Sequence, residues 1–363
     1  QTNTVFPNVV PGAETPEPTQ PGDAELQAIM AQLQKLDTDA AKFGNDEAAQ
    51  VRYQLQRSEV LQQLAERAKS AEDRFEWQKQ RADSLITAIQ LNSSDEATQR
   101  LREFFETVRQ QDNGAGLASY IAFRQISVQY FRKMQAPASD FAAVQKEWLE
   151  NLDKFVTDFP EAEDAPEALS QLAMGLEFTG KEDAARSSYT KLTESFPKSP
   201  LAVRARGAIE RLDLVGKPFT LRGADLRKGT VDVQQYSGKV VLVDYWATTC
   251  DPWKNDLPKL KELYTKYHGK GFEIIGISLD TEKTDVSKYV QTAAIPWPVV
   301  FEPGGLDCPP ALQYGILALP TQFLVDGQGM VVSRNIHVSQ LEEELKKLIK
   351  KFFLPKEEGP KTA

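Results

Sequence analysis

Apolar residues recur at intervals of three and four through the first half of the chain, from Asp23 to about Val215. This spacing is typical of amphipathic helices that bury one face. The clearest interruption is "DNGAGLAS", Asp112 to Ser119, because its Asn and Gly residues break the pattern. The pattern predicts an all-helical domain over residues 23–214. The apolar positions that define its first helices are Leu26, Ile29, Met30, Leu33, Leu36, Val51, Leu55, Leu61, Leu64, Leu101, Phe104, Phe105 and Val108.

A partial repeat lies in the later part of this helical region. The stretch "KFVTDFPEAEDAPEALSQL" recurs as "KLTESFPKSPLAVRARGAIERL", which places Phe159-Pro160 and Phe196-Pro197 37 residues apart. A helix-turn-helix unit of this period resembles a tetratricopeptide repeat. A plain helical bundle, in which the Phe-Pro turns merely end helices, explains the same residues. Under both interpretations the polar faces hold no catalytic cluster, so we expect a domain that docks a protein partner or acts as a spacer.

The pattern changes near Leu214, where strands begin to alternate with helices. Two continuous apolar runs, "KVVLVDYWA" and "FEIIGISLD", are typical of strands buried on both faces of a parallel sheet. The segment between them has the spacing of one helix, which predicts a βαβ unit. A helix around 284–292, a strand "WPVVFE", a short helix near 310–314, a hairpin turning at Asp326-Gly327 and a final helix follow. The sequence therefore predicts an α/β domain over residues 215–355.

Composition and charge restrict the functions open to this chain. Its 363 residues are enough for two domains, and 41% hydrophobic with 26% charged residues is ordinary for a soluble protein. A net charge of -9 argues against nucleic acid as a partner. No apolar run approaches the roughly 20 residues that a bilayer crossing needs. We interpret residues 1–22, which are rich in proline, as a leader or linker left after processing, and residues 356–363 as a polar tail.

One motif carries the chemistry, because "GKVVLVDYWATTCDPWKNDLP" leads from a buried strand through Cys250 into a helix. It is similar to the motif of the TlpA-like thiol-disulfide oxidoreductases and the related redoxins of the AhpC/TSA type. The segment "ALPTQFLVDGQGMVV" is similar to the cis-proline segment of that family. The resemblance implies a thioredoxin fold, with a central mixed sheet flanked by helices. It also implies a cis Leu319-Pro320 bond that faces Cys250, and substrate contacts by Trp246, Thr249, Asp251, Pro252, Trp253, Leu319 and Pro320.

The same resemblance implies a cellular setting and a need for no cofactor. Proteins of this kind work on the oxidising side of a bacterial cell membrane. We therefore expect a periplasmic or otherwise exported protein, with an N-terminal leader or membrane anchor that has been removed.

The site departs from the family pattern at Thr249, at Asp251 and above all at Trp253, which stands where a second cysteine would complete CxxC. Cys250 at a helix start lies among unpaired backbone N–H groups, which favour the thiolate, so we predict a nucleophilic thiol. A dithiol cycle needs a second thiolate to break the mixed disulfide. We therefore predict a thiol that reacts but cannot resolve its own adduct, beside a tryptophan too large to be fully buried.

Two other residues are candidates for a catalytic role. Cys308, in the loop "EPGGLDCPP", follows a strand predicted to run parallel to the strand before Cys250, so both loops open on one edge of the sheet. It is either a resolving partner or a lone thiol too distant to bridge. Asp244 matches the buried acid that some thioredoxins use to handle the proton of their second cysteine, or is a hydrogen-bonded core carboxylate. His268 and His337 have no metal-ligand spacing, so we predict no metal site.

Two functions of different classes follow from these residues. The first is a thioredoxin-like oxidoreductase with a single-cysteine site that acts on a protein disulfide or a small thiol. The second is a redox-inactive binding protein that keeps the peptide groove beside Pro320. A peroxidase with Cys308 as its resolving cysteine is disfavoured. The sequence around the reactive cysteine of peroxiredoxins resembles PxxxTxxC, and this chain has Val243 at the proline position and Ala247 at the threonine position. The retained Cys250 favours the oxidoreductase.

Overall fold

The computed structural model describes residues 21–92, 94–111, 113–137, 139–227 and 229–353. Contacts divide the chain into two compact units, one that ends at Asp164 and one that begins at Ala165, and each is described by itself. The first helix begins at Pro21, two residues earlier than expected. Residues 1–20 of the predicted leader and the predicted tail 356–363 lie outside the described residues.

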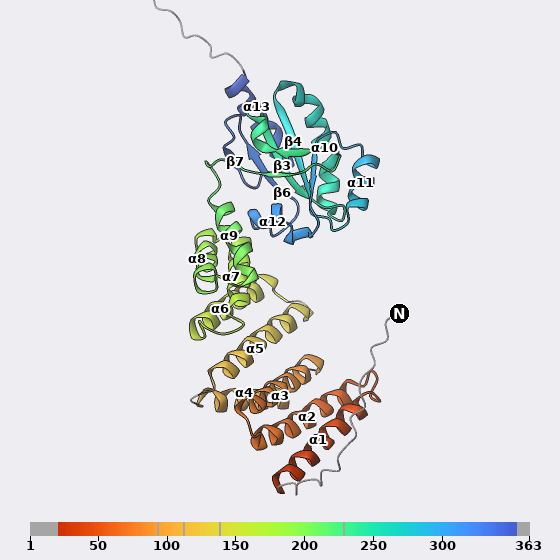
Figure 1. Cartoon of the computed structure of the whole chain (residues 1–363), viewed down its shortest axis with the longest axis vertical. Coiled ribbons are helices and arrows are strands. Elements are labelled where there is room, and N and C mark those ends of the chain that lie inside the picture. Colours follow the sequence, from red (N-terminus) through yellow and green to blue (C-terminus); the bar gives the residue numbers. More distant parts are fainter. Residues whose placement is uncertain (1–20, 93, 112, 138, 228, 354–363) are drawn as a thin grey trace, which may run out of the picture. The chain divides into compact units, whose positions relative to one another are not determined.

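The described residues of the first unit are helices joined by short turns (Figure 1). Sequence and structure agree closely at α4, where the Ser94 hydroxyl accepts a hydrogen bond from the Ala97 N–H and so caps the first turn. The α4 face made by Leu101, Phe104 and Val108 is buried, as the three-and-four spacing predicts. The helices are α1 (Pro21–Ala40), α2 (Glu47–Arg67), α3 (Ala71–Asn92), α4 (Asp95–Arg109), α5 (Ala115–Gln135) and α6 (Phe141–Asp158).

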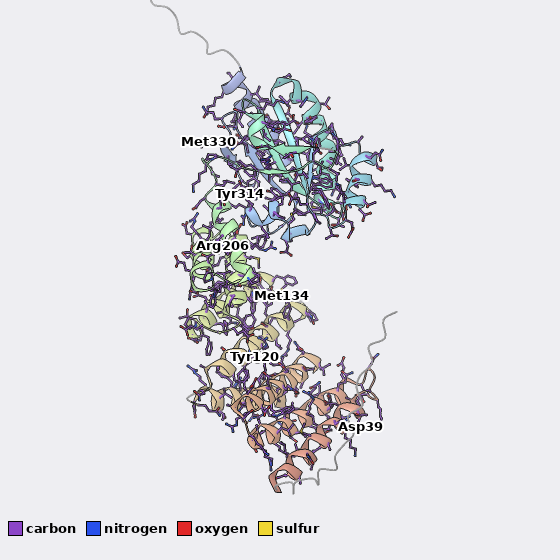
Figure 2. The ribbon with its side chains drawn as sticks, in the orientation of Figure 1. Asp39, Tyr120, Met134, Arg206, Tyr314 and Met330 are labelled. Atoms are coloured by element: carbon purple, nitrogen blue, oxygen red, sulfur yellow. The ribbon has the colours of Figure 1, made fainter. Side chains whose placement is uncertain are left out.

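The core of this unit lies among α3, α4 and α5, with a second cluster between α1 and α2. Met30 was expected on the buried face of α1, but its side chain is 46% exposed, while Ile29 and Leu33 are buried. Tyr120 of α5, labelled in Figure 2, donates a hydrogen bond of 2.6 Å to Asp83 of α3. Burial and, after it, this hydrogen bond raise the pKa of Tyr120 to about 12. A polar contact thus adds to the apolar packing that joins these two helices.

The two Phe-Pro turns share one backbone conformation at the ends of two helices. Phe159 follows α6 with φ -131° and ψ 64°, and Phe196 follows α8 with φ -129° and ψ 55°. In each turn the phenylalanine N–H bonds to the carbonyl four residues earlier. The proline that comes next cannot continue the helix. The repeated sequence therefore encodes a repeated helix stop.

The second unit begins with three helices, α7 (Ala165–Phe178), α8 (Glu182–Ser195) and α9 (Pro200–Leu212). No strand occurs among the described residues from 23 to 214, so the helical prediction for this region is confirmed. The helix α9 packs closely on the short helix α12 (Pro309–Gln313) of the α/β region. Gly207 and Gly315 permit this approach, because a Cβ on Gly207 would lie 2.1 Å from the Leu312 carbonyl oxygen and one on Gly315 would lie 2.4 Å from the Ala208 nitrogen.

A mixed five-stranded sheet in the order β5-β4-β3-β6-β7 forms the centre of the second unit (Figure 1). Strand β3 pairs in parallel with β4 and antiparallel with β6, and β4 pairs in parallel with β5. The predicted hairpin is the antiparallel pair β6 and β7. The strands are β3 (Val240–Trp246), β4 (Phe272–Ser278), β5 (Val299–Phe301), β6 (Thr321–Val325) and β7 (Val331–Ser333), and a separate ribbon consists of β1 (Arg222–Ala224) and β2 (Thr230–Asp232).

Side chains of β3 alternate between two cores because the strand is buried on both faces. Val240, Leu242 and Trp246 enter one cluster, which the helices α10 (Asp251–Tyr267), α11 (Lys283–Thr292) and α13 (Val338–Phe353) cover. Val241, Val243 and Tyr245 enter the other cluster, together with α12 and the segment around Phe219. The observed fold is the one that the sequence resemblance implied, a mixed sheet flanked by helices.

Candidate functional site

Cys250 lies where the chain leaves β3 and enters α10. It is the N-cap residue of that helix, with extended backbone angles of φ -84° and ψ 95°. Its N–H bonds to the Ala247 carbonyl at 3.0 Å, and its carbonyl accepts the Lys254 N–H at 3.1 Å. Pro252 stands in the first turn, where the helix needs no N–H donor. The thiol is half-buried at a helix start, so local sequence rules place it as expected.

The loop before Cys250 is held by a carboxylate that the sequence reading missed. Both oxygens of Asp280 accept the Thr248 N–H at 3.0 Å, and the Thr248 hydroxyl also donates to this carboxylate. Ser278 donates a further hydrogen bond of 2.7 Å to Asp280. Asp280 stands two residues after β4, at the end of the run "FEIIGISLD", and the carboxyl ends of parallel strands meet at one edge of a sheet. That topology was the signal that could have identified it.

Trp253, in the position of a second cysteine, is fully buried. Its exposed fraction is 0%, and its ring stacks on Trp246 with centroids 4.1 Å apart and planes 8° from parallel. Its Nε1–H donates a 2.7 Å hydrogen bond to Asp244. The expectation that Trp253 is too large to hide was wrong, because the indole lies flat on a second indole and its one polar atom is paired. Trp246 is also 0% exposed, so neither ring offers surface to a substrate in this structure.

Asp244 is the acceptor at the centre of this arrangement. It is 0% exposed, and it accepts a second hydrogen bond of 2.9 Å from Gln322, its register partner on β6. Burial raises the pKa of Asp244 to about 6, although both hydrogen bonds favour the charged form. Gln322 was not predicted as part of the site. An amide inside the apolar strand "TQFLV" was the signal for it.

A glycine on the neighbouring strand makes room for Trp246 and for Trp297. Gly276 of β4 is the register partner of Asp244. A Cβ at Gly276 would lie 2.9 Å from Nε1 of Trp246 and 3.3 Å from Nε1 of Trp297. Any larger residue there would push Trp246 from its place under Trp253. Gly276 therefore belongs to the structural support of the site, which sequence reasoning had not recognised.

The Leu319-Pro320 peptide bond is cis, which confirms the first part of that prediction, whereas the claim that it faces Cys250 stays a prediction. Thr321, the next residue, is paired with Tyr245 near the end of β3. Pro320 thus lies at the same end of the sheet as the loop that carries Cys250. Leu319 and Pro320 are half-buried, whereas Thr249, Asp251 and Pro252 are exposed. Direct contact of these residues with a substrate stays a prediction.

Cys308 is placed away from Cys250. Both cysteines are free thiols, and Cys308 is only 1% exposed. It packs with Tyr245 and Tyr314 in the cluster on one face of the sheet, whereas Cys250 packs against the cluster on the other face. Burial raises the pKa of the Cys308 thiol, which disfavours the nucleophilic thiolate. The structure does not bring the two thiols together.

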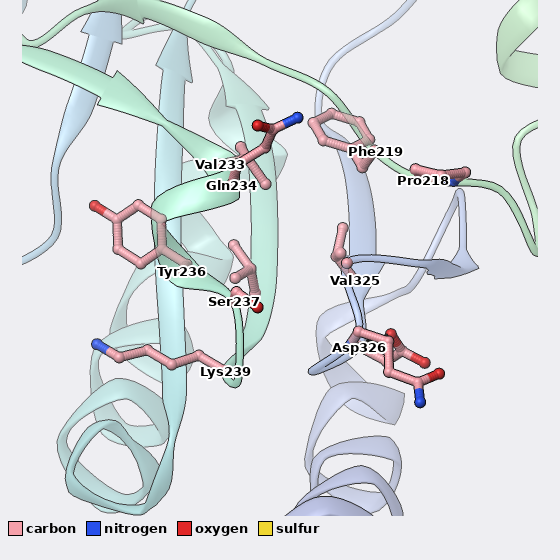
Figure 3. A pocket seen from close by; sticks show the side chains of 12 residues that line it. Pro218, Phe219, Val233, Gln234, Tyr236, Ser237, Lys239, Val325 and Asp326 are labelled. Carbon is pink, nitrogen blue, oxygen red and sulfur yellow. Dashed lines mark hydrogen bonds between the residues drawn. The ribbon is translucent and has the colours of Figure 1, made fainter.

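A separate hollow of about 200 Å³ lies at the other end of β3, around Lys239 and Val241. Figure 3 shows Tyr236 and Lys239 on one wall and Val325 and Asp326 on the facing wall. Asp326 accepts the backbone N–H groups of Gln328 and Met330, so its role is to hold the turn between β6 and β7. This hollow therefore belongs to the hairpin turn and not to the thiol site. Among the residues that the structure covers, no group of His, Cys, Asp and Glu side chains could hold a metal ion.

Comparison with known proteins places the similarity in the second unit. Residues 215–334 match the model of the AhpC/TSA family. A thiol-disulfide oxidoreductase ResA from Bacillus thuringiensis subsp. konkukian is 34% identical over 127 residues, which are 35% of this chain and 71% of the relative. A ResA from Halalkalibacterium halodurans is 31% identical over 130 residues, with the same coverage of each chain.

Among solved structures, the thioredoxin domain of a thiol-disulfide oxidoreductase from Bacteroides vulgatus is similar, with 28% sequence identity and a TM-score of 0.35. The match covers 37% of this chain and 97% of that domain. Helices of the length and apolar character that a membrane crossing needs do not occur in the described part of the chain.

Proposed function

Because the chain belongs, through its C-terminal α/β region, to the ResA-type thiol-disulfide oxidoreductases, we propose that it performs thiol-disulfide exchange with one cysteine, Cys250. The observation that supports this proposal is the difference in exposure between two residues within one turn of α10. Cys250 is half-exposed at the start of α10, while the position three residues later holds a fully buried tryptophan. The site therefore keeps the attacking group and lacks the resolving group.

The proposed reaction is a single exchange step. The Cys250 thiolate attacks one sulfur of a partner disulfide, a new bond forms between the two sulfurs, and the other partner sulfur leaves as a thiolate. In a CxxC site the second cysteine would then release the first one. Here Trp253 carries no sulfur, so the mixed disulfide persists until an external thiol attacks it. The product is a covalent complex of long lifetime.

The buried acid supports the same reading. In thioredoxins that use such an acid, it handles the proton of the second cysteine, which this chain lacks. Asp244 accepts hydrogen bonds from Trp253 and Gln322 instead. We propose that its role here is to hold the Trp253 ring in place. A buried carboxylate is costly unless it is hydrogen-bonded, so the pair forms a matched unit.

Partners and cellular location extend this proposal. The named relatives are thiol-disulfide oxidoreductases, and we propose protein thiols or disulfides as substrates and an exported location. We also propose that the helical region 23–214 docks a protein partner, while 215–355 carries the chemistry. A hydrogen bond joins the helical region to the region with Cys250. Arg211 of α9 donates it to the Tyr314 carbonyl at 2.9 Å, which fixes the last helix of the helical region to the α/β region.

The test is adduct formation with cystamine, a small disulfide. Intact-mass measurement of the folded protein should find one cysteamine adduct, on Cys250, that persists after excess cystamine is removed. The same adduct should form on Cys308→Ser and be absent from Cys250→Ser. An adduct that persists only in Cys308→Ser would show that Cys308 resolves it. No adduct on folded protein would favour the redox-inactive binding protein.

A further inference from the structure

A cleft beside Pro320 is not explained by the thiol chemistry alone. It has a volume of about 360 Å³ and is lined by the end of α7, the start of α8, Arg211 of α9, the loop around Pro320 and the segment after β7. One wall thus comes from the α7–α8 hairpin and the other from the loop that holds the cis peptide bond. All of these segments belong to the second unit.

Ion pairs fix the helical hairpin against this loop. Arg211, which is 8% exposed, bonds to Glu177 at the end of α7 and to the carbonyl of Tyr314, which is labelled in Figure 2. Arg334, which follows β7, bonds to Glu182 at the start of α8. Arg204 adds a 3.1 Å hydrogen bond to the Ile316 carbonyl. The cleft is therefore a built feature held by charge-assisted bonds from both walls.

The cleft offers an apolar anchor and no unbalanced charge. Phe178, on its rim, is 68% exposed, more than any other large hydrophobic side chain among the described residues. Leu317, Ala318 and Pro320 continue the apolar surface. The lining carboxylates Glu177 and Glu182 are each paired with a lining arginine. A charged small thiol would find no free counter-ion among these lining residues, whereas an apolar side chain would find an exposed aromatic ring.

We infer that this cleft binds the polypeptide next to the reactive cysteine of a partner protein, and that it selects a large uncharged side chain there. The inference rests on the proposed exchange at Cys250 and specifies its substrate class. The cleft shares Pro320 with the predicted substrate-contact residues, and Pro320 lies at the same end of the sheet as the loop that carries Cys250. A segment whose cysteine reaches Cys250 would run past Pro320 and place its neighbouring side chain on Phe178.

The exchange step balances without any added oxidant or reductant. The Cys250 thiolate attacks the cysteine sulfur of a peptide that carries a 2-thiopyridyl disulfide. The bond between Cys250 and the peptide sulfur forms, the bond to the thiopyridyl sulfur breaks, and pyridine-2-thiolate leaves with the electron pair and takes a proton from water to become pyridine-2-thione. The absorbance of pyridine-2-thione reports the rate of this step.

The test compares three probes with this one leaving group: a peptide whose cysteine is flanked by leucine, a peptide whose cysteine is flanked by glutamate, and cysteamine. On the full chain, the leucine peptide should react about tenfold faster than the glutamate peptide. In Phe178→Ser the ratio of the leucine-peptide rate to the cysteamine rate should fall about tenfold. The control is Phe141→Ser, which removes a ring that is 60% exposed in the other unit. In this control the ratio of the leucine-peptide rate to the cysteamine rate should be the same as in the unchanged chain.

The outcomes separate the cleft from the chemistry. Equal ratios in Phe178→Ser and the unchanged chain, with rapid Cys250 adducts of all three probes, would overturn the role of the cleft and leave the exchange reaction standing. A glutamate peptide that reacts as fast as the leucine peptide would overturn the selection of an uncharged side chain. No Cys250 adduct with any probe would overturn the exchange reaction and, with it, the inference.

Discussion

The two cysteines of this chain have the same local pattern and opposite environments. Each is the N-cap of a helix with proline in its first turn, each has an extended backbone, and neither side chain makes a capping hydrogen bond. Yet Cys250 is half-buried and Cys308 is 1% exposed. Cys250 begins the long helix α10 after the carboxyl end of β3, whereas Cys308 begins the five-residue helix α12 inside an apolar cluster. The same local pattern at a helix start therefore leaves one thiol accessible and the other buried, and packing makes the difference.

The most direct way to alter this comparison is to restore the missing thiol with Trp253→Cys. The new cysteine would stand three residues after Cys250, as in CxxC, and should attack the Cys250 mixed disulfide from within the molecule. We expect the cystamine adduct to be released about a thousandfold faster than from the unchanged chain, because the attack becomes intramolecular. Time-resolved intact-mass measurement checks this.

The control for this variant is Trp253→Ala, which opens the same space without a sulfur. Its adduct should persist as in the unchanged chain. Release from both variants at one rate would mean that the ring merely shields the disulfide from solvent thiols. Circular dichroism must first show that both variants are folded, since emptying a buried tryptophan site costs about 3–5 kcal/mol.

Alkylation rates sharpen the comparison between the two thiols themselves. With iodoacetamide on the native protein, Cys250 should react about a hundredfold faster than Cys308, because Cys308 must await local opening of its cluster. In denaturant the two rates should converge. Peptide mapping of the alkylated protein measures both rates. Equal native rates would contradict the burial of Cys308.

The pH dependence of stability tests the buried carboxyl group of Asp244, which accepts the Trp253 hydrogen bond. The pKa of Asp244 is raised to about 6, above its ordinary value, so the folded state holds a proton that the unfolded state has lost. Stability should therefore fall as pH rises from about 4 to about 6 and then level, by about 3 kcal/mol from this group. Urea unfolding across this range, compared with Asp244→Asn, isolates the contribution. The same slope in both proteins would exclude Asp244 as its source.

The smallest expected effect concerns the Trp253 hydrogen bond. Trp253→Phe leaves one hydrogen bond fewer on the buried Asp244. Trp297→Phe is a matched control, because Trp297 is also 0% exposed and its Nε1 has no hydrogen-bond partner among the described residues. We expect Trp253→Phe to lose about 1 kcal/mol more of the free energy of unfolding than Trp297→Phe. Urea unfolding above pH 7 measures the difference, and equal losses would show that the bond contributes nothing.

Much of the fold could be predicted from local pattern. The helical half, the α/β half and the hairpin of β6 and β7 follow from periodicity and turn residues, which act over a few neighbouring positions. The site was predicted in part. Cys250 at the start of α10 and the cis bond before Pro320 follow from motifs within short segments. Asp280, Gln322 and Gly276 were missed because they reach the site across the sheet.

The amino-acid sequence by itself determined which segments form helices and strands and where the reactive motif stands, because these depend on backbone propensity and apolar spacing. Only the tertiary structure decided which individual side chains are buried and which are accessible. Trp253 is buried because its ring stacks on Trp246 and its Nε1–H bonds to Asp244, while Gln322 of β6 bonds to the same carboxylate and Gly276 of β4 leaves space beside Trp246. Cys308 is buried because residues remote in sequence, such as Tyr245, cover it. Burial is a property of the whole assembly of elements, and no local pattern contains it.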